Sequence, residues 1–330
     1  MTLLEVRDLV VEYGTDQAVR AVDRVSFDVD RGEIFGVLGE SGSGKTTLMT
    51  AITRLQRPPA RIAGGTVTYR PSDGPPAELV GCSPQQLRDL RWERVAVVFQ
   101  SAMSSLNPVM RIGTQFADAI RAHRSMKRAA AWDRAADLLD LVGIPRDRVR
   151  GYPHELSGGM RQRAAIALSL ACEPDLVVMD EPTTAVDVVM QRQILDNLKQ
   201  LQDSFGFSVL FVTHDLSLLV ELADRIMVMY AGRAVEIAPA ADIYRDPKHP
   251  YTQGLRDSFP SLHGPRRELR GIGGAPPDLR QLPAGCAFEP RCPQRVDDCR
   301  ETSPALIERD HTQAACLLLD LQEVRHAGGR

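Results

Sequence analysis

The stretch Gly39-Glu40-Ser41-Gly42-Ser43-Gly44-Lys45-Thr46 decides how the chain is expected to fold. A short apolar run, Ile34–Leu38, opens directly into it, and Thr47–Ile52 continues as a helix. Binding ATP requires backbone N–H groups that point inward without obstruction, and the positive end of the following helix adds to the attraction. Lys45 then reaches the β- and γ-phosphates, and the Thr46 hydroxyl completes the Mg²⁺ shell. The residues predicted to bind ATP in this segment are Gly39, Ser41, Gly42, Ser43, Gly44, Lys45, Thr46 and Thr47.

Two further apolar runs end in polar residues that suit phosphate chemistry. Leu176–Met179 is followed by Asp180 and Glu181, and a carboxylate at the end of a buried strand can hold Mg²⁺ through water. Glu181 is then placed to polarise the attacking water. Val209–Val212 leads to Thr213-His214-Asp215, where a histidine can hydrogen-bond the γ-phosphate and sense its presence. Alone, that histidine would more simply be a surface residue.

Another segment, Leu156-Ser157-Gly158-Gly159-Met160, opens a helix and so offers donors to an anion. With the phosphate loop and the two strand ends, it follows the order and rough spacing of the ATP-binding cassette (ABC) ATPases. Residues 1 to about 255 resemble the nucleotide-binding subunit of an ABC transporter. The tail is similar to that of the oligopeptide/dipeptide importer group, as is His249-Pro250-Tyr251-Thr252, for which the sequence suggests no chemistry. Met160 stands where many relatives have Gln, a mild departure.

The resemblance implies roles for residues that mean little alone. Ser157, Gly158 and Gly159 contact nucleotide bound to the opposite subunit, which implies a two-subunit sandwich with ATP at the seam. Asp187, in Ala185-Val186-Asp187, belongs to the loop that lines this seam. Gln100 touches Mg²⁺ and the water, and its loop, residues 101–110, faces the membrane partner. Tyr13 stacks on adenine through its π-face, although it could be an ordinary strand aromatic.

The resemblance also implies the fold class. It is an α/β, P-loop, ABC-type nucleotide-binding domain, with a RecA-like core, an antiparallel β-subdomain and a helical insert, followed by a cysteine-containing C-terminal extension. Alternating strands and helices independently favour a doubly wound, mostly parallel sheet. The expected domains are 1–255, with the helical subdomain at about 101–165, and 256–330. Residues 132–142 carry apolar side chains at helical spacing, and Gly143 sits where a C-terminal cap belongs.

Composition narrows the possible partners. The formal net charge of −3 gives no reason to expect nucleic acid. The sequence holds no uninterrupted apolar run of about 18 residues, so no membrane span is expected. The N-terminus lacks the charged start and long apolar stretch of a secretory signal and is expected to form a β-strand.

Four cysteines cluster in the tail, at Cys286, Cys292, Cys299 and Cys316. In a cytosolic chain, such a cluster favours metal binding over disulfides. The pattern resembles the importer tail that is associated with a [4Fe–4S] cluster in some members, and four thiolates suit such a cluster. Zinc, with His311 able to replace one ligand, and free structural thiols are the alternatives. Any such cluster would serve to stabilise the folded tail rather than to transfer electrons.

Together these features predict the ATP-hydrolysing subunit of a prokaryotic ABC importer, most simply for di- or oligopeptides, with ATP and Mg²⁺ as cofactors. It would lie peripherally on the cytoplasmic face of the membrane, and its expected partners are a second ATPase subunit, two permease subunits and an extracytoplasmic binding protein. The second ATPase subunit is expected to be a paralogue, with a homodimer as the alternative. Oligosaccharides or nickel chelates are alternative substrates. An exporter subunit and a soluble ABC ATPase acting on nucleic acid or ribosomes are more distant alternatives.

Overall fold

The computed structural model describes residues 1–14, 18–100, 105–184, 186–258, 271–309 and 311–319. The chain divides into two compact units, each assembled from segments that are far apart in the sequence. The first unit comprises Met1–Glu5, Asp28–Ile34 and Val67–Val212, and the second comprises Val6–Phe27, Phe35–Thr66 and Thr213–Arg330.

Parallel strands form the centre of the first unit. β6 (Val95–Val98) pairs with β7 (Leu176–Asp180), and β7 pairs with β8 (Ser208–Thr213), both in parallel register. Every residue of β7 and β8 is buried, as expected of parallel strands whose two faces are both covered. The apolar runs predicted as strands at 176–179 and 209–212 are therefore confirmed.

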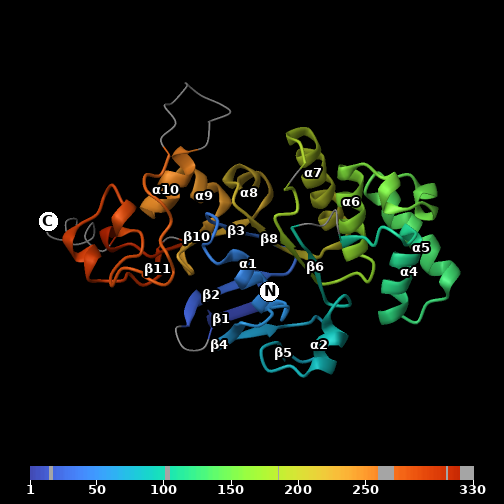
Figure 1. The fold of residues 1–330 in the computed structure, drawn as a ribbon, viewed down its shortest axis with the longest axis horizontal. Helices are drawn as coiled ribbons and strands as arrows, with labels where there is room; N and C mark the ends of the chain where they lie inside the picture. Colours follow the sequence, from blue (N-terminus) through green and yellow to red (C-terminus); the bar gives the residue numbers. More distant parts are fainter. Residues whose placement is uncertain (15–17, 101–104, 185, 259–270, 310, 320–330) are drawn as a thin grey trace. The chain divides into compact units, whose positions relative to one another are not determined.

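Three helices of the first unit pack side by side (Figure 1): α4 (Ile112–His123), α5 (Arg128–Leu141) and α6 (Gly158–Ser169). The buried residues of α4 and α5 recur at helical spacing, which is the pattern that predicted a helix over 132–142, whereas most of the α6 residues from 162 onward are buried. Gly143 follows α5 with a φ of 68°, the left-handed value that a helix-ending glycine adopts. The remaining helices described in this unit are α2 (Pro84–Leu90), α7 (Val188–Phe205), and the 3₁₀ turns η1 (Arg146–Arg150) and η2 (Pro153–Glu155).

The second unit also has a sheet at its centre. β3 (Ile34–Leu38) pairs in parallel with β9 (Arg225–Tyr230), which pairs antiparallel with β10 (Arg233–Pro239). β10 continues antiparallel to β12 (Thr312–Ala314), and β12 to β11 (Ile307–Arg309), so the tail adds two strands to this sheet. The helices described in this unit are α1 (Lys45–Ile52), α8 (Leu216–Leu222), α9 (Ala240–Arg245), α10 (Pro250–Asp257), and the turns η3 (Glu289–Arg291) and η4 (Asp297–Arg300).

A separate four-stranded sheet has the order β2-β1-β4-β5. Its strands are β1 (Thr2–Tyr13), β2 (Val19–Asp30), β4 (Ala60–Tyr69) and β5 (Ala77–Glu78). The N-terminus thus forms the predicted strand.

β4 begins at Ala60 and runs through Gly64 and Gly65. Gly65, with a φ of 86°, lets this strand approach its neighbour, because a Cβ there would lie 2.5 Å from the Asp8 carbonyl oxygen. β2 runs without interruption from Val19 to Asp30. Among the described residues, no helix has the length and apolar character that crossing a membrane requires.

Candidate nucleotide site and cysteine cluster

The phosphate loop lies in the second unit, between β3 and α1. Lys45 is only 6% exposed, and its Nζ donates to the carbonyl oxygens of Gly39, at 2.7 Å, and Glu40, at 3.0 Å. The ammonium group is therefore held inside the loop rather than extended into solvent. The Ser43 hydroxyl oxygen is buried without a hydrogen-bond partner among the described residues, so it retains capacity for a further polar group.

The glycines of the loop serve two different purposes. A Cβ on Gly39 would lie 2.5 Å from the Met229 carbonyl oxygen, and one on Gly44 would lie 2.2 Å from that of Ala21. Both positions are therefore packed too tightly for any side chain. Gly42, by contrast, has a φ of 81°, and a Cβ added there would meet no atom within 4 Å, so this side of the loop is open.

Tyr13, at the end of β1, lies beside this loop within the same unit. Its hydroxyl and the Thr47 hydroxyl are 3.2 Å apart, and 38% of the Tyr13 side chain is exposed. An aromatic face next to a phosphate loop is the arrangement that base stacking needs. His214, which follows β8, is exposed, while Asp215 caps α8 by accepting from the Ser217 N–H at 2.9 Å.

The carboxylates predicted to hold Mg²⁺, Asp180, and to polarise the attacking water, Glu181, lie in the first unit. Asp180, the last residue of β7, is 3% exposed. Gln100 Nε2 donates to Glu181 Oε2 at 2.9 Å, and the Thr184 hydroxyl lies 3.1 Å from the same oxygen. The structure thus brings Gln100 and Glu181 together, as the resemblance implied. Thr184, also at this cluster, was not predicted.

Glu181 adopts an uncommon backbone conformation. Its φ is 45°, in the left-handed region, where a non-glycine residue costs on the order of 1 kcal/mol. Its N–H donates to the Val212 carbonyl oxygen of β8 at 2.8 Å, which holds the strained residue in place. Strain of this kind is typical of residues whose side chain must point in one functional direction.

The segment predicted to act on a second subunit begins α6. Ser157 is exposed and caps this helix, because its Oγ accepts from the Met160 N–H at 3.3 Å. Asp187 caps α7 in the same way, accepting from the Met190 N–H at 2.9 Å.

The starts of these two helices meet within the first unit. A Cβ on Gly159 would lie 2.5 Å from the Met190 sulfur, so any larger residue here would require the Met190 side chain to move. Gly158 is the first residue of α6. Ala185, which was also predicted to line the seam, lies outside the described residues, as does part of the Gln100 loop.

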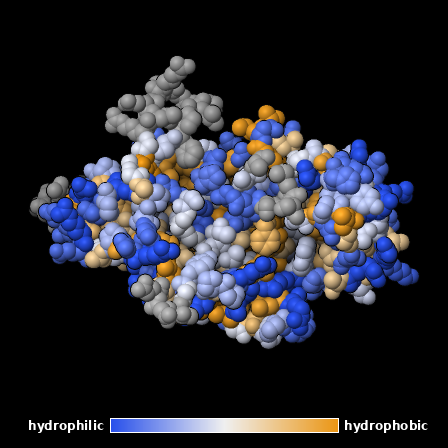
Figure 2. Space-filling view, viewed as in Figure 1, coloured by the Kyte–Doolittle hydropathy of each residue, from blue (hydrophilic) through white to orange (hydrophobic). Residues whose placement is uncertain are grey.

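A pair of exposed valines follows the Asp187 cap. Val188 is 79% exposed and Val189 is 71% exposed. Figure 2 shows hydrophobic atoms gathered at the end of α7, near the top of the view. Apolar groups at such exposure are typical of a surface that another molecule covers.

The four tail cysteines converge on one small cavity in the second unit. Cys286, Cys292, Cys299 and Cys316 all line it, together with His249 and Phe288. Burial raises the pKa of the Cys286 and Cys292 thiols above the usual range, and raises that of Cys316 to about 11. None of the four forms a disulfide. The predicted alternative ligand, His311, is exposed and does not line this cavity.

Convergence alone does not make a metal site. Among the described residues, no group of three or more His, Cys, Asp or Glu side chains is arranged to hold an ion as it stands. The four sulfur atoms therefore supply a suitable set of donors, but they would have to move closer together around an ion.

The structure gives the His249-Pro250-Tyr251 segment a structural role that the sequence did not reveal. His249 is 2% exposed and caps α10, with its Nδ1 accepting from the Tyr251 N–H at 3.0 Å. Glu236, fully buried, accepts from the N–H groups of Lys248, at 2.7 Å, and His249, at 2.9 Å. Burial raises the pKa of Glu236 and lowers that of His249 from 6.5 to about 4.

This burial predicts a loss of stability in mild acid. Between pH 6.5 and about 4 the unfolded chain takes up a proton on His249 that the folded chain does not, so the free energy of unfolding decreases as the pH is lowered. Over this whole range the free energy of unfolding should decrease by about 3 kcal/mol, at roughly 1.4 kcal/mol per pH unit. The variant His249→Asn keeps a capping acceptor but cannot titrate. Denaturant unfolding should show that wild type loses about 2 kcal/mol more than the variant between pH 7 and 5; an identical pH dependence would contradict the neutral, buried histidine.

Comparisons with known proteins agree with these sites. A family model described as "ABC transporter" matches residues 22–184, and one described as "Oligopeptide/dipeptide transporter, C-terminal region" matches residues 235–299. The chain is 44% identical over 318 residues to a probable peptide ABC transporter ATP-binding protein, y4tR, of Sinorhizobium fredii, a match that covers 95% of this chain and 93% of that protein. It is 41% identical over 333 residues to the dipeptide transport ATP-binding protein DppD of Bacillus subtilis, covering 98% and 97%. A match to the oligopeptide transport ATP-binding protein OppD of Mycobacterium tuberculosis, 45% identical, covers 98% of this chain but 53% of that protein.

Solved structures show the same fold. The dimeric ATP-binding cassette MJ0796, in a post-hydrolysis state bound to ADP and Pi, superposes with a TM-score of 0.63 at 25% identity, covering 72% of this chain and 99% of that chain. The cbiO1 protein of Clostridium perfringens superposes with a TM-score of 0.64 at 23% identity, covering 77% and 95%.

The fold and its loops therefore define an ABC-type ATPase cassette, and the predicted fold class is confirmed. More particularly, the chain belongs to the family of oligopeptide/dipeptide ABC transporter ATP-binding proteins. The predicted family is thus confirmed as well, and with it an ATPase activity coupled to transport.

Proposed function

We propose that this chain is the ATP-hydrolysing subunit of an importer for di- or oligopeptides, attached to the cytoplasmic face of the membrane. Its partners would be two permease subunits, an extracytoplasmic binding protein and a second ATPase subunit, which we take to be a paralogue. The peptide and dipeptide transport functions named for the relatives, together with the tail match, support peptides over oligosaccharides or nickel chelates. The observation that carries ATP binding is the phosphate loop, with its enclosed lysine and open side.

In this proposal the second unit binds the nucleotide. Lys45 and the N–H groups of residues 39–47 bind the phosphates, the Thr46 hydroxyl is a Mg²⁺ ligand, and Tyr13 stacks on adenine. The enclosed position of Lys45 and the exposed face of Tyr13 support these roles. His214 would hydrogen-bond the γ-phosphate, and its exposure leaves it accessible for that contact.

The first unit would supply the groups that act on water and Mg²⁺. Asp180 would hold Mg²⁺ through water, Gln100 would touch both Mg²⁺ and the attacking water, and Glu181 would polarise that water. The 2.9 Å hydrogen bond between Gln100 and Glu181 supports their action on one water molecule. Phosphoryl transfer of this kind needs positioning and charge neutralisation rather than a covalent intermediate.

We further propose that Ser157, Gly158 and Gly159 complete the nucleotide site of the second ATPase subunit, with Asp187 at the same seam. The exposure of Ser157, its position at a helix start, and the exposed valines that follow Asp187 support a partner at this surface. ATP binding would then close the two subunits together, and hydrolysis would release them.

Reconstitution tests the transport function. The assembled complex in lipid vesicles should accumulate a labelled peptide only with its binding protein and with ATP on the cytoplasmic side. Uptake of an oligosaccharide or a nickel chelate instead would contradict the peptide substrate but would still support an importer. ATP hydrolysis without uptake of any of these would contradict an importer.

We also propose that Cys286, Cys292, Cys299 and Cys316 hold a [4Fe–4S] cluster, with zinc as the alternative. Four free thiols that line one cavity, with Cys299 buried and the other three half-buried, support a thiolate-ligated group. Such a group would stabilise a segment with little core of its own.

Metal analysis decides between these groups. Protein purified without oxygen should be brown and contain about four irons per chain, whereas about one zinc per chain would favour the alternative. The variant Cys299→Ser should lower the metal content, and Cys82→Ser, an isolated thiol, should not. Absence of both metals would leave the cysteines as free thiols.

A further inference from the structure

A partly buried ion pair, in which the Glu40 side chain is 27% exposed, joins the tail to the phosphate loop within the second unit. Arg291 Nη1 lies 2.7 Å from Glu40 Oε2, and Nη2 lies 3.0 Å from Oε1, so the contact is bidentate. The Arg291 side chain is only 5% exposed, and its Nε also donates to the Gly273 carbonyl oxygen at 2.9 Å. A bidentate pair of this kind fixes geometry as well as charge. No local sequence pattern indicates it, because the partners are 251 residues apart.

Helix α10, which precedes the tail, also contacts Glu40 of the phosphate loop. The Glu40 N–H donates to the Tyr251 hydroxyl at 3.0 Å, and Tyr251 is fully buried. Its ring packs against those of Tyr230 and Phe288, with centroids 4.6 Å and 5.4 Å away, so the hydroxyl cannot move freely. Lys45 holds the Glu40 carbonyl oxygen at 3.0 Å. The N–H, carbonyl and carboxylate of Glu40 are therefore all fixed.

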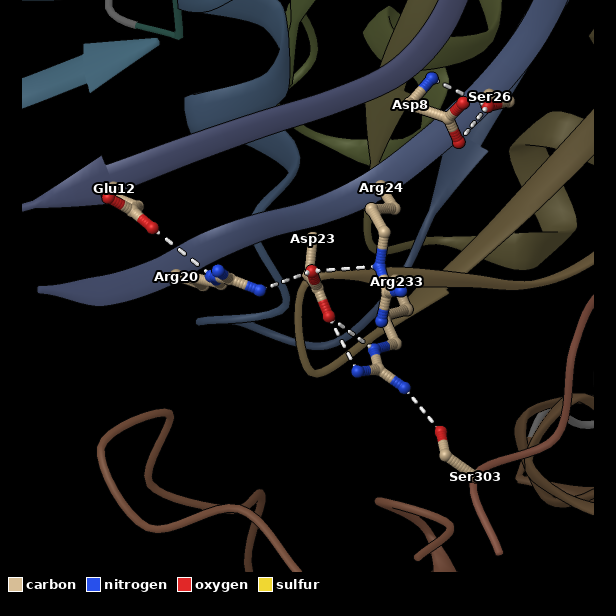
Figure 3. Close-up of polar contacts among 8 residues, drawn as sticks. All are labelled: Asp8, Glu12, Arg20, Asp23, Arg24, Ser26, Arg233 and Ser303. Carbon is tan, nitrogen blue, oxygen red and sulfur yellow. Dashed lines mark hydrogen bonds and ion pairs between the residues drawn. The ribbon is translucent and has the colours of Figure 1, made fainter. Parts of the chain in front are cut away.

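A second chain of contacts reaches the loop at Ser43. The Ser43 carbonyl oxygen accepts from the Gly232 N–H at 3.0 Å, and the Gly232 carbonyl oxygen accepts from the Asp23 N–H at 2.8 Å. Figure 3 shows the Asp23 carboxylate paired with Arg233, with Nε at 2.8 Å, and Arg233 in turn bonded to Ser303 of the tail. Two independent routes thus lead from the tail to the loop.

We propose that Arg291 and Tyr251 are positioning residues for the phosphate loop. Through Glu40, the tail holds the loop in the form that accepts nucleotide, so that tail packing and ATP affinity are coupled. The charges support this role: ATP brings several negative charges to a loop that already carries the Glu40 carboxylate, and Arg291 neutralises that carboxylate. Because coupling of this kind is reciprocal, bound nucleotide should also stabilise the tail. The inference rests on nucleotide binding by this loop.

Removing either contact should weaken nucleotide binding more than it slows hydrolysis. With an ATP analogue carrying an N-methylanthraniloyl fluorophore, Arg291→Gln should raise the Kd about tenfold, as expected when one member of a partly buried, bidentate charge pair is removed. Tyr251→Phe should raise it less, because only one neutral hydrogen bond is lost. The variant Arg291→Lys keeps the positive charge but cannot make the bidentate contact of the guanidinium group, so its affinity should lie between those of Arg291→Gln and wild type. Hydrolysis at saturating ATP should stay within about threefold of wild type, since neither residue touches the reacting atoms.

The controls separate a positioning role from general damage to the tail. Arg300→Gln removes an arginine of the same segment that is 65% exposed and pairs with Glu289, so it should leave the Kd unchanged. In a double-mutant cycle, Glu40→Gln combined with Arg291→Gln should cost less affinity than the sum of the single changes. An unchanged Kd in Arg291→Gln, additive effects in the cycle, or an equal loss in Arg300→Gln would overturn the inference. The same assay should first show that the wild-type protein binds the ATP analogue and that Lys45→Ala weakens this binding. If it does, an unchanged Kd in Arg291→Gln contradicts the coupling alone; if it does not, nucleotide binding by the loop is itself contradicted.

Discussion

Replacing Glu181 by Gln is expected to abolish ATP turnover while leaving ATP binding intact. The amide has nearly the same shape as the carboxylate but cannot polarise a water molecule, so the loss should be on the order of 10³-fold in kcat, within the range for general-base catalysis. The left-handed φ of 45° and the hydrogen bonds from Gln100 and Thr184 fix the direction of this side chain. Because the amide oxygen of glutamine can accept the same hydrogen bonds, we expect the variant to fold like the wild-type protein. Steady-state phosphate release and nucleotide binding, measured on the same preparation, test both halves.

A matched control for this variant is available in the same unit. Glu173, 51% exposed and paired with Arg124 and Arg134 on the surface, can be changed to Gln without touching the catalytic group. That variant should hydrolyse ATP at the wild-type rate. If Glu181→Gln hydrolysed ATP as fast as Glu173→Gln, Glu181 would not be the catalytic carboxylate.

Replacing Lys45 by Ala is expected to weaken nucleotide binding by about 10²-fold, as follows from losing a buried, charge-assisted contact. The ammonium group donates to the Gly39 and Glu40 carbonyl oxygens, so its positive charge is held at a fixed position in the loop, and alanine removes that charge. Fluorescence titration with the labelled ATP analogue gives the Kd directly. Hydrolysis at low ATP should fall in parallel.

The control is Lys199→Ala, which removes an exposed lysine of α7 and should leave the Kd at the wild-type value. Because both changes remove one positive charge, a difference between them reports position rather than net charge. Equal affinities for the Lys45→Ala variant and for wild type would refute the phosphate-loop assignment.

Much of the nucleotide site could be predicted because its signals are local. The glycine loop follows an apolar strand and begins a helix, and this order is contained in residues 34–52. Ser157 and Asp187 cap α6 and α7, whereas the role predicted for them at the seam was implied by the family resemblance. Local chemistry of this kind survives in the sequence without knowledge of the fold.

The contacts that depend on distant segments could not be predicted. Arg291 reaches Glu40 only because the tail packs against the loop, and nothing in the spacing of either residue indicates it. In β4, Gly64 and Gly65 would by themselves favour a loop, and only the close pairing of the strand shows why glycine is required at Gly65. The cysteine spacing indicated convergence, but the separation of the sulfur atoms is a property of the folded tail.

The central claim is that two ATPase subunits meet face to face, so that Ser157 of one completes the triphosphate site of the other. Cryo-electron microscopy of the assembled complex, with Glu181→Gln and bound ATP, measures this directly as the distance from the Ser157 Oγ to the nearest γ-phosphate oxygen. We predict hydrogen-bond contact, about 2.7 Å, with the nucleotide held by the phosphate loop of the partner subunit. A complex that binds ATP but leaves the Ser157 Oγ more than roughly 8 Å from any triphosphate oxygen, about three times the hydrogen-bond distance, would contradict the face-to-face arrangement.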